Sequence, residues 1–235
     1  MSARRGLAVT SSTGVTSVAI GLVGADLPMA AATIETDRRH AEEIAPLIQT
    51  LVAEAGMKLG ELDVLVVDRG PGRFTGLRVG LATVRTLAFA LNIPVVGLTS
   101  LAVLANVGSV VDHEWYAGSG ETVTSVIDAR RNEVFQQSFK AGRPIGDEMV
   151  GPADELAGRA AGIVVGDGLD RYRDVYQPEV GSVPSGGMAM VGVTVDAGTM
   201  LKMAGGADPK PGAEIEPLYL RNPDVNPNVK TRPRV

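Results

Sequence analysis

Residues 69–80 of this chain read RGPGRFTGLRVG and stand between a short run of Leu and Val and a long apolar helical pattern. Glycines permit tight or positive-φ backbone, and the first turn of a helix exposes unpaired amides that can hold an anion. The spacing departs from the phosphate-binding motifs, because no Lys follows Gly76 and Thr75 stands where a dinucleotide motif has its third glycine. We therefore favour a structural strand-to-helix turn. An anion or nucleotide contact at Gly70, Gly72 and Thr75 is the alternative.

The helix expected over Thr75–Leu91 lacks the broad polar face of a surface helix. At 100° per residue, one side carries an apolar stripe made of Leu77, Leu81, Val84, Ala88 and Leu91. The other side is uncharged and carries Val79, Ala82, Thr83, Thr86, Phe89 and Ala90. The charged residues are Arg78 and Arg85, at one edge. Two interpretations remain open: a central helix wedged between two halves of the chain, or a face that binds a partner or a second copy.

On both sides of this segment the chain alternates between strand and helix patterns. The first half predicts strands at 6–10, 16–22, 28–34, 62–67 and 94–98, with helices at 40–55 and 75–91. The second half repeats the order more loosely, with strands at 122–128, 133–140 and 162–166 and helices at 152–161 and 195–204. Two βββαβα copies indicate a duplicated α/β fold, with domains at 1–105 and 106–235. The stretches 106–121 and 181–192 are predicted to be loops.

Composition excludes several classes of protein. The 235 residues include no cysteine, which removes disulfide scaffolds and thiolate metal sites. A net charge of −5 and 4% aromatic residues argue against strong direct binding of nucleic acid. The first residues lack the apolar core and cleavage site of an export signal, and we expect no stretch that reaches the roughly 18 apolar residues of a membrane helix. These features favour a cytoplasmic protein that touches RNA only indirectly.

The chain has few residues that could carry out catalysis. Enzymes built on actin-like and sugar-kinase-like folds use an acid on the first strand, but residues 6–12 read GLAVTSS. His40 and His113 lie far apart without a metal-binding spacing, so we predict a packed or capping role for His40 and a solvated His113. Asp68 and Asp128 end predicted strands, where catalytic carboxylates occur, but we favour structural capping for both. We assign no catalytic residue and no metal ligand.

Four blocks of sequence resemble the TsaB family, also called YeaZ. They are the stretch that begins at Arg69 and runs to Ala82, residues 97–101 (GLTSL), residues 127–135 (IDARRNEVF) and residues 216–221 (EPLYLR). The blocks occur in order along nearly the whole chain, and the Gly-Pro-Gly-x-Phe-Thr-Gly part is highly specific. Two departures stand out: Arg73 replaces the usual Ser, and Thr10 or Ser11 stands where many members have Asp.

The resemblance implies a tandem ribonuclease-H-like fold of the superfamily that contains actin, Hsp70 and sugar kinases. It also implies a non-catalytic subunit that pairs with the catalytic subunit TsaD and the ATPase TsaE to make threonylcarbamoyladenosine next to the tRNA anticodon. Many members form homodimers through the face that binds TsaD. ATP or ADP and the metal would then belong to the partner subunits, with no cofactor in this chain.

On this basis, we expect the partner interface on one face of the helix and its start. It would comprise Phe74, Thr75, Arg78, Val79, Ala82, Thr83, Thr86 and Phe89. Two other classes of function remain as alternatives: an independent enzyme, either an actin-like ATP-dependent phosphotransferase or a glycoprotease-like metallopeptidase, and a direct reader of tRNA.

Overall fold

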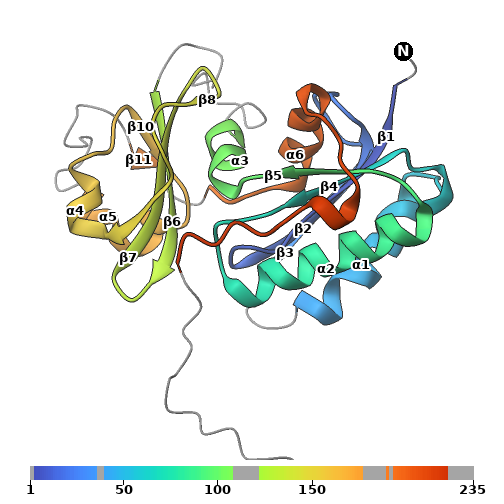
Figure 1. Ribbon diagram of the computed structural model, residues 1–235, viewed down its shortest axis with the longest axis horizontal. Helices are drawn as coiled ribbons and strands as arrows, with labels where there is room; N and C mark the ends of the chain where they lie inside the picture. The colour runs from blue at the N-terminus through green and yellow to red at the C-terminus, as the bar shows by residue number, and fades with distance from the viewer. Residues whose placement is uncertain (1–2, 36–39, 108–121, 177–188, 191–192, 222–235) are drawn as a thin grey trace, which may run out of the picture.

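The computed structural model describes residues 3–35, 40–107, 122–176, 189–190 and 193–221, and Figure 1 shows two β-sheets side by side. The first sheet contains β1 (Arg5–Thr10), β2 (Val15–Leu22), β3 (Ala30–Glu35), β4 (Val64–Asp68) and β5 (Val95–Leu98). Its strand order is β3-β2-β1-β4-β5, in which β1 runs antiparallel to β2 and parallel to β4. The helices α1 (His40–Glu54) and α2 (Phe74–Leu91) cover one face of this sheet.

The second sheet repeats the topology of the first. It contains β6 (Thr122–Arg130), β7 (Glu133–Lys140), β8 (Arg143–Pro144), β9 (Met149–Pro152), β10 (Ile163–Val165) and β11 (Ala189–Met190). Both β8 and β9 pair with β7, so the path β9-β7-β6-β10-β11 matches β3-β2-β1-β4-β5 strand for strand. The helices α4 (Ala153–Ala157) and α5 (Gly168–Tyr176) cover its outer face. This confirms the predicted duplicated α/β fold.

The last helix of each repeat packs against the sheet of the other repeat. Helix α3 (Ser100–Val107) follows β5 but packs on β6 and β7, whereas α6 (Ala197–Met203) packs on β1 and β2. Apolar side chains from both sheets and both helices form one buried cluster, which includes Leu104 and Leu201. The chain therefore returns to the first sheet after β11, a return that the boundaries 1–105 and 106–235 do not anticipate. We call the two sheets with their outer helices the first and second lobes.

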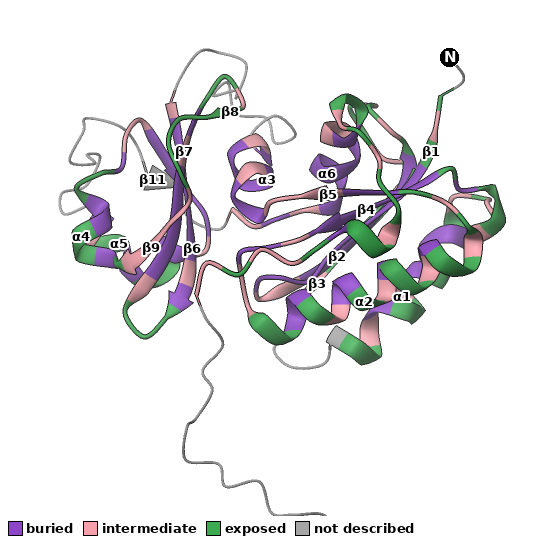
Figure 2. Cartoon of the chain, viewed as in Figure 1, coloured by how far each residue is buried: buried purple, intermediate pink, exposed green. Residues whose placement is uncertain are grey.

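Helix α2 lies on the outside of the first lobe and not between the lobes, so the structure contradicts the interpretation of a wedged central helix. Its inner face is buried through Leu77, Leu81, Val84 and Ala88, as the apolar stripe predicts, with Leu91 partly buried. Figure 2 shows the opposite face largely exposed. By length and composition α2 could cross a membrane, contrary to the expectation that no stretch qualifies. It is the one helix of the described residues that meets this criterion, which soluble core helices also meet.

Most predicted elements are present with shifted ends. Helix α1 continues through Pro46, and the strand predicted at 28–34 begins two residues later. Sequence reasoning missed α3, α5, β8, β9 and β11, because short elements carry too few residues to show a period. Most of the two predicted loops, His113 and the side chain of His40 lie outside the described residues.

We predict that Leu104→Ala lowers the free energy of unfolding by about 2–5 kcal/mol, because it opens a cavity in the shared cluster. Both lobes should lose stability together in urea denaturation followed by circular dichroism. The matched control is Leu27→Ala, since Leu27 is 71% exposed and its truncation should cost little. Separate transitions for the two lobes would contradict a shared core.

Candidate functional site: an exposed helix face and a neighbouring polar cluster

A buried carboxylate fixes the turn that starts α2. Asp68 ends β4, and its Oδ1 accepts hydrogen bonds from Gly70 N at 2.8 Å and from Ser100 Oγ at 2.6 Å. Its Oδ2 accepts bonds from Thr10 Oγ1 at 2.8 Å and from Ser12 Oγ. Burial raises the pKa of Asp68, while these hydrogen bonds act in the opposite direction. The carboxylate is enclosed by groups of its own chain, so it serves the turn, as structural capping predicts.

The β1–β2 loop packs directly beneath this turn. Arg73 N donates to Ser12 O at 2.5 Å, and Ser11 Oγ donates to Gly76 O at 2.8 Å. A Cβ on Gly72 would lie 2.3 Å from Ser12 O, so only glycine fits this approach. Two amides of the turn, at residues 70 and 73, are thus used within the chain. Thr75 is exposed at the helix start, and the predicted anion contact at Gly70, Gly72 and Thr75 stays a prediction.

The outer face of α2 presents most of the predicted partner-interface residues to the surface. Phe89 is 90% exposed and Phe74 is 40% exposed, which is unusual for large aromatic side chains. The other exposed members of the predicted set are Thr75, Arg78, Ala82 and Thr86, whereas Val79 and Thr83 are partly buried. The helix contains no acidic residue. This arrangement suits protein binding, because small uncharged residues allow close approach and exposed aromatic residues supply contact area.

The two arginines of α2 hold the C-terminal segment of the chain. The Arg78 guanidinium stacks on the Phe74 ring at 3.8 Å, and its Nε donates to Tyr219 Oη at 3.0 Å. Arg85 donates from Nε to Gly212 O at 3.1 Å and from Nη2 to Ala213 O at 2.9 Å. Sequence reasoning placed both arginines at an edge of the helix but had no signal for these distant partners.

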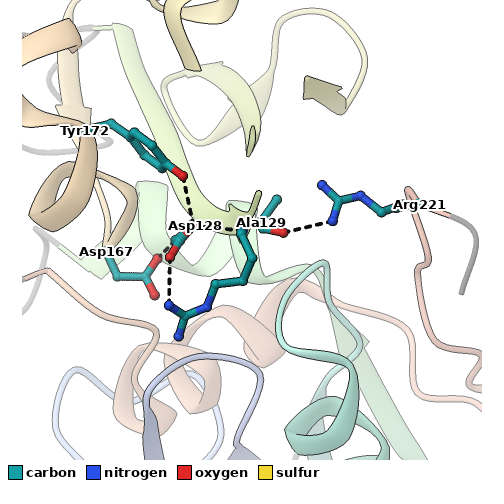
Figure 3. A network of polar contacts seen from close by, with 6 residues as sticks. Asp128, Ala129, Asp167, Tyr172 and Arg221 are labelled. Atoms are coloured by element: carbon teal, nitrogen blue, oxygen red, sulfur yellow. Dashed lines mark hydrogen bonds and ion pairs between the residues drawn. The ribbon is translucent and has the colours of Figure 1, made fainter. Parts of the chain in front are cut away.

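A polar cluster lies at the end of β6, close to the first lobe (Figure 3). Asp128 N donates to Asp167 Oδ1 at 3.2 Å, and Asp128 Oδ1 accepts from Arg130 N at 2.8 Å and from Tyr172 Oη at 3.4 Å. Burial is the main cause that raises the pKa of Asp167 to about 6, and the Asp128 charge adds to it, whereas the Arg73 charge opposes it. The sequence identifies Asp128 as a candidate because it ends a predicted strand, where catalytic carboxylates occur. Asp167 follows β10 in the same way, within a Gly-Asp-Gly signal that could have identified it.

This cluster does not form a metal site in the part of the chain that the structure describes. No three His, Asp or Glu side chains come together there, and the cluster combines two carboxylates with arginines. Arg130 Nη1 lies 3.4 Å from Asp128 Oδ2, so the Asp128 charge is partly offset. The arrangement can orient the β6–β7 turn, and its Asp167 carboxyl keeps its proton up to a pH of about 6, the value to which burial raises its pKa.

Two sheets of the same five-strand order, joined through a shared central layer, define a protein of the actin-like, ribonuclease-H-like class. A solved structure titled "YeaZ from Pseudomonas aeruginosa" matches with a TM-score of 0.74 and 28% identity, covering 92% of this chain and 100% of that one. Residues 33–200 match the sequence model of the family described as "TsaD: tRNA N6-adenosine threonylcarbamoyltransferase".

Bacterial proteins are also similar to this chain in sequence. An uncharacterized protein of Mycobacterium tuberculosis is 33% identical over 223 residues, 92% of each chain. One from Mycobacterium leprae is 30% identical over 231 residues, and the alignment spans 55% of its length. The Escherichia coli "tRNA threonylcarbamoyladenosine biosynthesis protein TsaB" is 29% identical over 137 residues, 57% of this chain and 54% of that protein. The chain belongs to the TsaB (YeaZ) family.

We predict that Asp68→Ala lowers the free energy of unfolding by about 3–5 kcal/mol, because it leaves three buried hydroxyls and one amide without their acceptor. Thermal and urea denaturation measure the loss. Asp26→Ala is the matched control, since the Asp26 side chain is 88% exposed and pairs only with Lys202 among the described residues. Equal stability of the two variants would show that the Asp68 network contributes nothing.

We predict that Asp167→Asn stabilises the protein at pH 7. A carboxyl whose pKa rises from 3.8 to about 6 on folding holds its proton more tightly in the folded state, so its contribution to stability is lost as pH rises from about 4 to 6. The substitution removes that loss, and the gain is up to about 3 kcal/mol, because one pKa unit corresponds to about 1.4 kcal/mol. Melting temperature measured from pH 4 to 8 should fall less steeply than in the wild type. Asp174→Asn, at an exposed position of α5, should leave the profile unchanged.

Proposed function

We propose that this chain takes part in the synthesis of tRNA threonylcarbamoyladenosine, as a non-catalytic subunit that binds TsaD through the outer face of α2. The names of its TsaB relatives support the pathway. The match of residues 33–200 to the TsaD family supports TsaD as the partner, because a chain of the same fold can present the equivalent patch, as the second copy does in a symmetric dimer. The observation that carries the interface is the exposed face of α2, which has no acidic residue and presents Phe89 90% exposed.

Several features favour a non-catalytic subunit over an enzyme. The first strand carries hydroxyl side chains where actin-like enzymes place an acid, and the nearest carboxylate, Asp68, is enclosed by Thr10, Ser12 and Ser100. That carboxylate cannot bind a metal or a substrate without losing the hydrogen bonds that hold the turn. We therefore place ATP or ADP and the metal on the partner subunits, TsaD and the ATPase TsaE.

The same face would also pair two copies of this chain when TsaD is absent, since it presents apolar area that either partner can cover. The net charge of −5 supports indirect contact with tRNA, through TsaD. A subunit of a tRNA-modifying assembly would work in the cytoplasm. The alternative functions are an ATP-dependent phosphotransferase and a metallopeptidase. Calorimetry with ATP and Mg²⁺, and a peptidase assay, on the isolated protein would reveal them.

We predict that Ala82→Glu weakens binding to TsaD by about 100-fold or more, because it places a larger, charged side chain where a small residue allows close approach at the centre of the interface. Threonylcarbamoyladenosine in tRNA from cells that carry only this variant should fall accordingly. Calorimetry measures the binding, and mass spectrometry of nucleosides measures the modification.

The matched control is Ala31→Glu, at an exposed position of β3 whose side chain points away from α2. Its TsaD affinity and its tRNA modification should equal those of the wild type. Wild-type behaviour of the Ala82 variant, with both proteins folded by circular dichroism, would refute the proposed interface.

A further inference from the structure

The last described segment, residues 208–221, runs over the first lobe and ends on the second; we call it the strap (Figure 1). At its start, Lys210 forms an antiparallel bridge with Val95, which covers the edge of β5. Ile215 is then buried in the core beneath α2, and Leu218 N donates to Arg69 O at 2.7 Å. The strap therefore follows the edge strand, the helix α2 and the glycine turn in succession.

Near its end the strap joins the outer face of α2. Tyr219 is 38% exposed, and its ring lies 5.4 Å from the Phe74 ring, with the Arg78 guanidinium next to both. Phe74 and Arg78 belong to the proposed TsaD-binding face. A partner that covers this face would also cover Tyr219 and restrict its motion.

Two residues later the strap reaches the second lobe. Arg221 Nη1 donates to Ala129 O at 3.0 Å, and its guanidinium pairs with Glu133 (Figure 3 shows the bond to Ala129). Ala129 lies at the bulge of β6, between the pairs Asp128–Val134 and Arg130–Glu133, and directly follows Asp128 of the polar cluster. Arg221 is thus the link between the strap and the β6–β7 turn.

That turn is strained. Arg130, Arg131 and Asn132 have φ values of 63°, 57° and 62°, in the left-handed region that L-residues other than Asn seldom adopt. A strained backbone of this kind persists only when neighbouring contacts hold it. Several such contacts are present: Asp128 Oδ1 accepts from Arg130 N, and Ala153 N donates to Asn132 O at 3.1 Å. Among them, Arg221 bridges Ala129 and Glu133 on the two sides of the turn.

We propose that Arg221 is a latch that holds the strained β6–β7 turn, and that the strap couples this turn to occupancy of the α2 face. The coupling rests on the proposed function, because it takes TsaD as the occupant. When the face is covered, Tyr219 is fixed, Arg221 stays on Ala129 and Glu133, and the turn keeps Asp128 beside Asp167. When Arg221 loses its contacts with Ala129 and Glu133, the turn moves toward more favourable φ values, and Asp128 and Asp167 lose their fixed geometry. Coupling of this kind is reciprocal, so loosening the latch also weakens binding at α2.

The isolated protein tests the latch by hydrogen exchange. We expect Arg221→Ala to speed exchange of the amides of residues 128–134 about tenfold or more, which corresponds to about 1.4 kcal/mol, with the core of the first sheet unchanged. Arg85→Ala is the matched control, because Arg85 holds the strap at residues 212 and 213 only. It should loosen residues 210–215 and leave the turn protected. Wild-type exchange of the turn in the Arg221 variant overturns the proposal.

Two further variants distinguish a local effect on the turn from a general loss of folding. Glu133→Gln removes the ion pair from the other side while Arg221 keeps its bond to Ala129 O, so it should speed exchange of the turn by a smaller factor. Arg221→Lys keeps the charge and should restore part of the protection. Uniform acceleration over the whole chain in all three variants, with loss of the circular dichroism signal, would mean that Arg221 supports the fold generally, and would overturn a local latch.

Purified TsaD tests the coupling. In the wild type, its addition should slow exchange both in α2 and at residues 128–134; in Arg221→Ala it should slow exchange in α2 only, with an affinity reduced about threefold to tenfold. Equal protection of the turn in both proteins, or no protection in either, overturns the coupling. If TsaD does not bind the wild type at all, the proposed function and the coupling both fail, while the exchange of the isolated protein still decides the latch.

Discussion

The hydrogen-bond network around Asp68 determines where the outer helix of the first lobe begins. Three hydroxyls and one amide from β1, its loop, the glycine turn and α3 converge on a single buried carboxylate. Because these groups come from four places in the chain, the carboxylate joins them in one arrangement that no local propensity would produce. The turn that follows is pressed against the β1–β2 loop, and Gly72 allows this contact. The direction of α2, and therefore the side chains that it presents outward, follows from this arrangement.

Helix α2 has two functions that usually fall to different elements. Its inner side closes the core of the first lobe, and its outer side remains uncovered by the described chain except where the strap passes. The arginines that the sequence places at one edge of the helix hold the strap. The outer face therefore combines small residues and exposed aromatic rings with arginines that are already hydrogen-bonded, a composition that suits a surface covered by another protein.

Much of this fold follows from sequence patterns, because β2, β4 and β5 are rich in Val, Ile and Leu and α2 has a clear apolar stripe. Asp68 and Asp128 could be found from their places at strand ends. The strap could not be predicted, because its contacts join residues that are far apart: 141 positions separate Arg78 from Tyr219, and 92 separate Arg221 from Ala129. Periodicity within a window carries no information about such pairs. The packing of α3 on the second sheet and of α6 on the first could not be predicted for the same reason. A helix pattern shows which face of the helix is apolar but not which sheet that face covers.

The exchange of the last helices has a consequence for how the protein is made. Helices α1 and α2 leave one face of the first sheet bare, and α6, which covers that face, is encoded about a hundred residues after β5. During translation, this apolar face of the first sheet therefore stays open to solvent and to chaperones until α6 has left the ribosome. The two repeats share one buried cluster, so neither repeat has a complete core of its own.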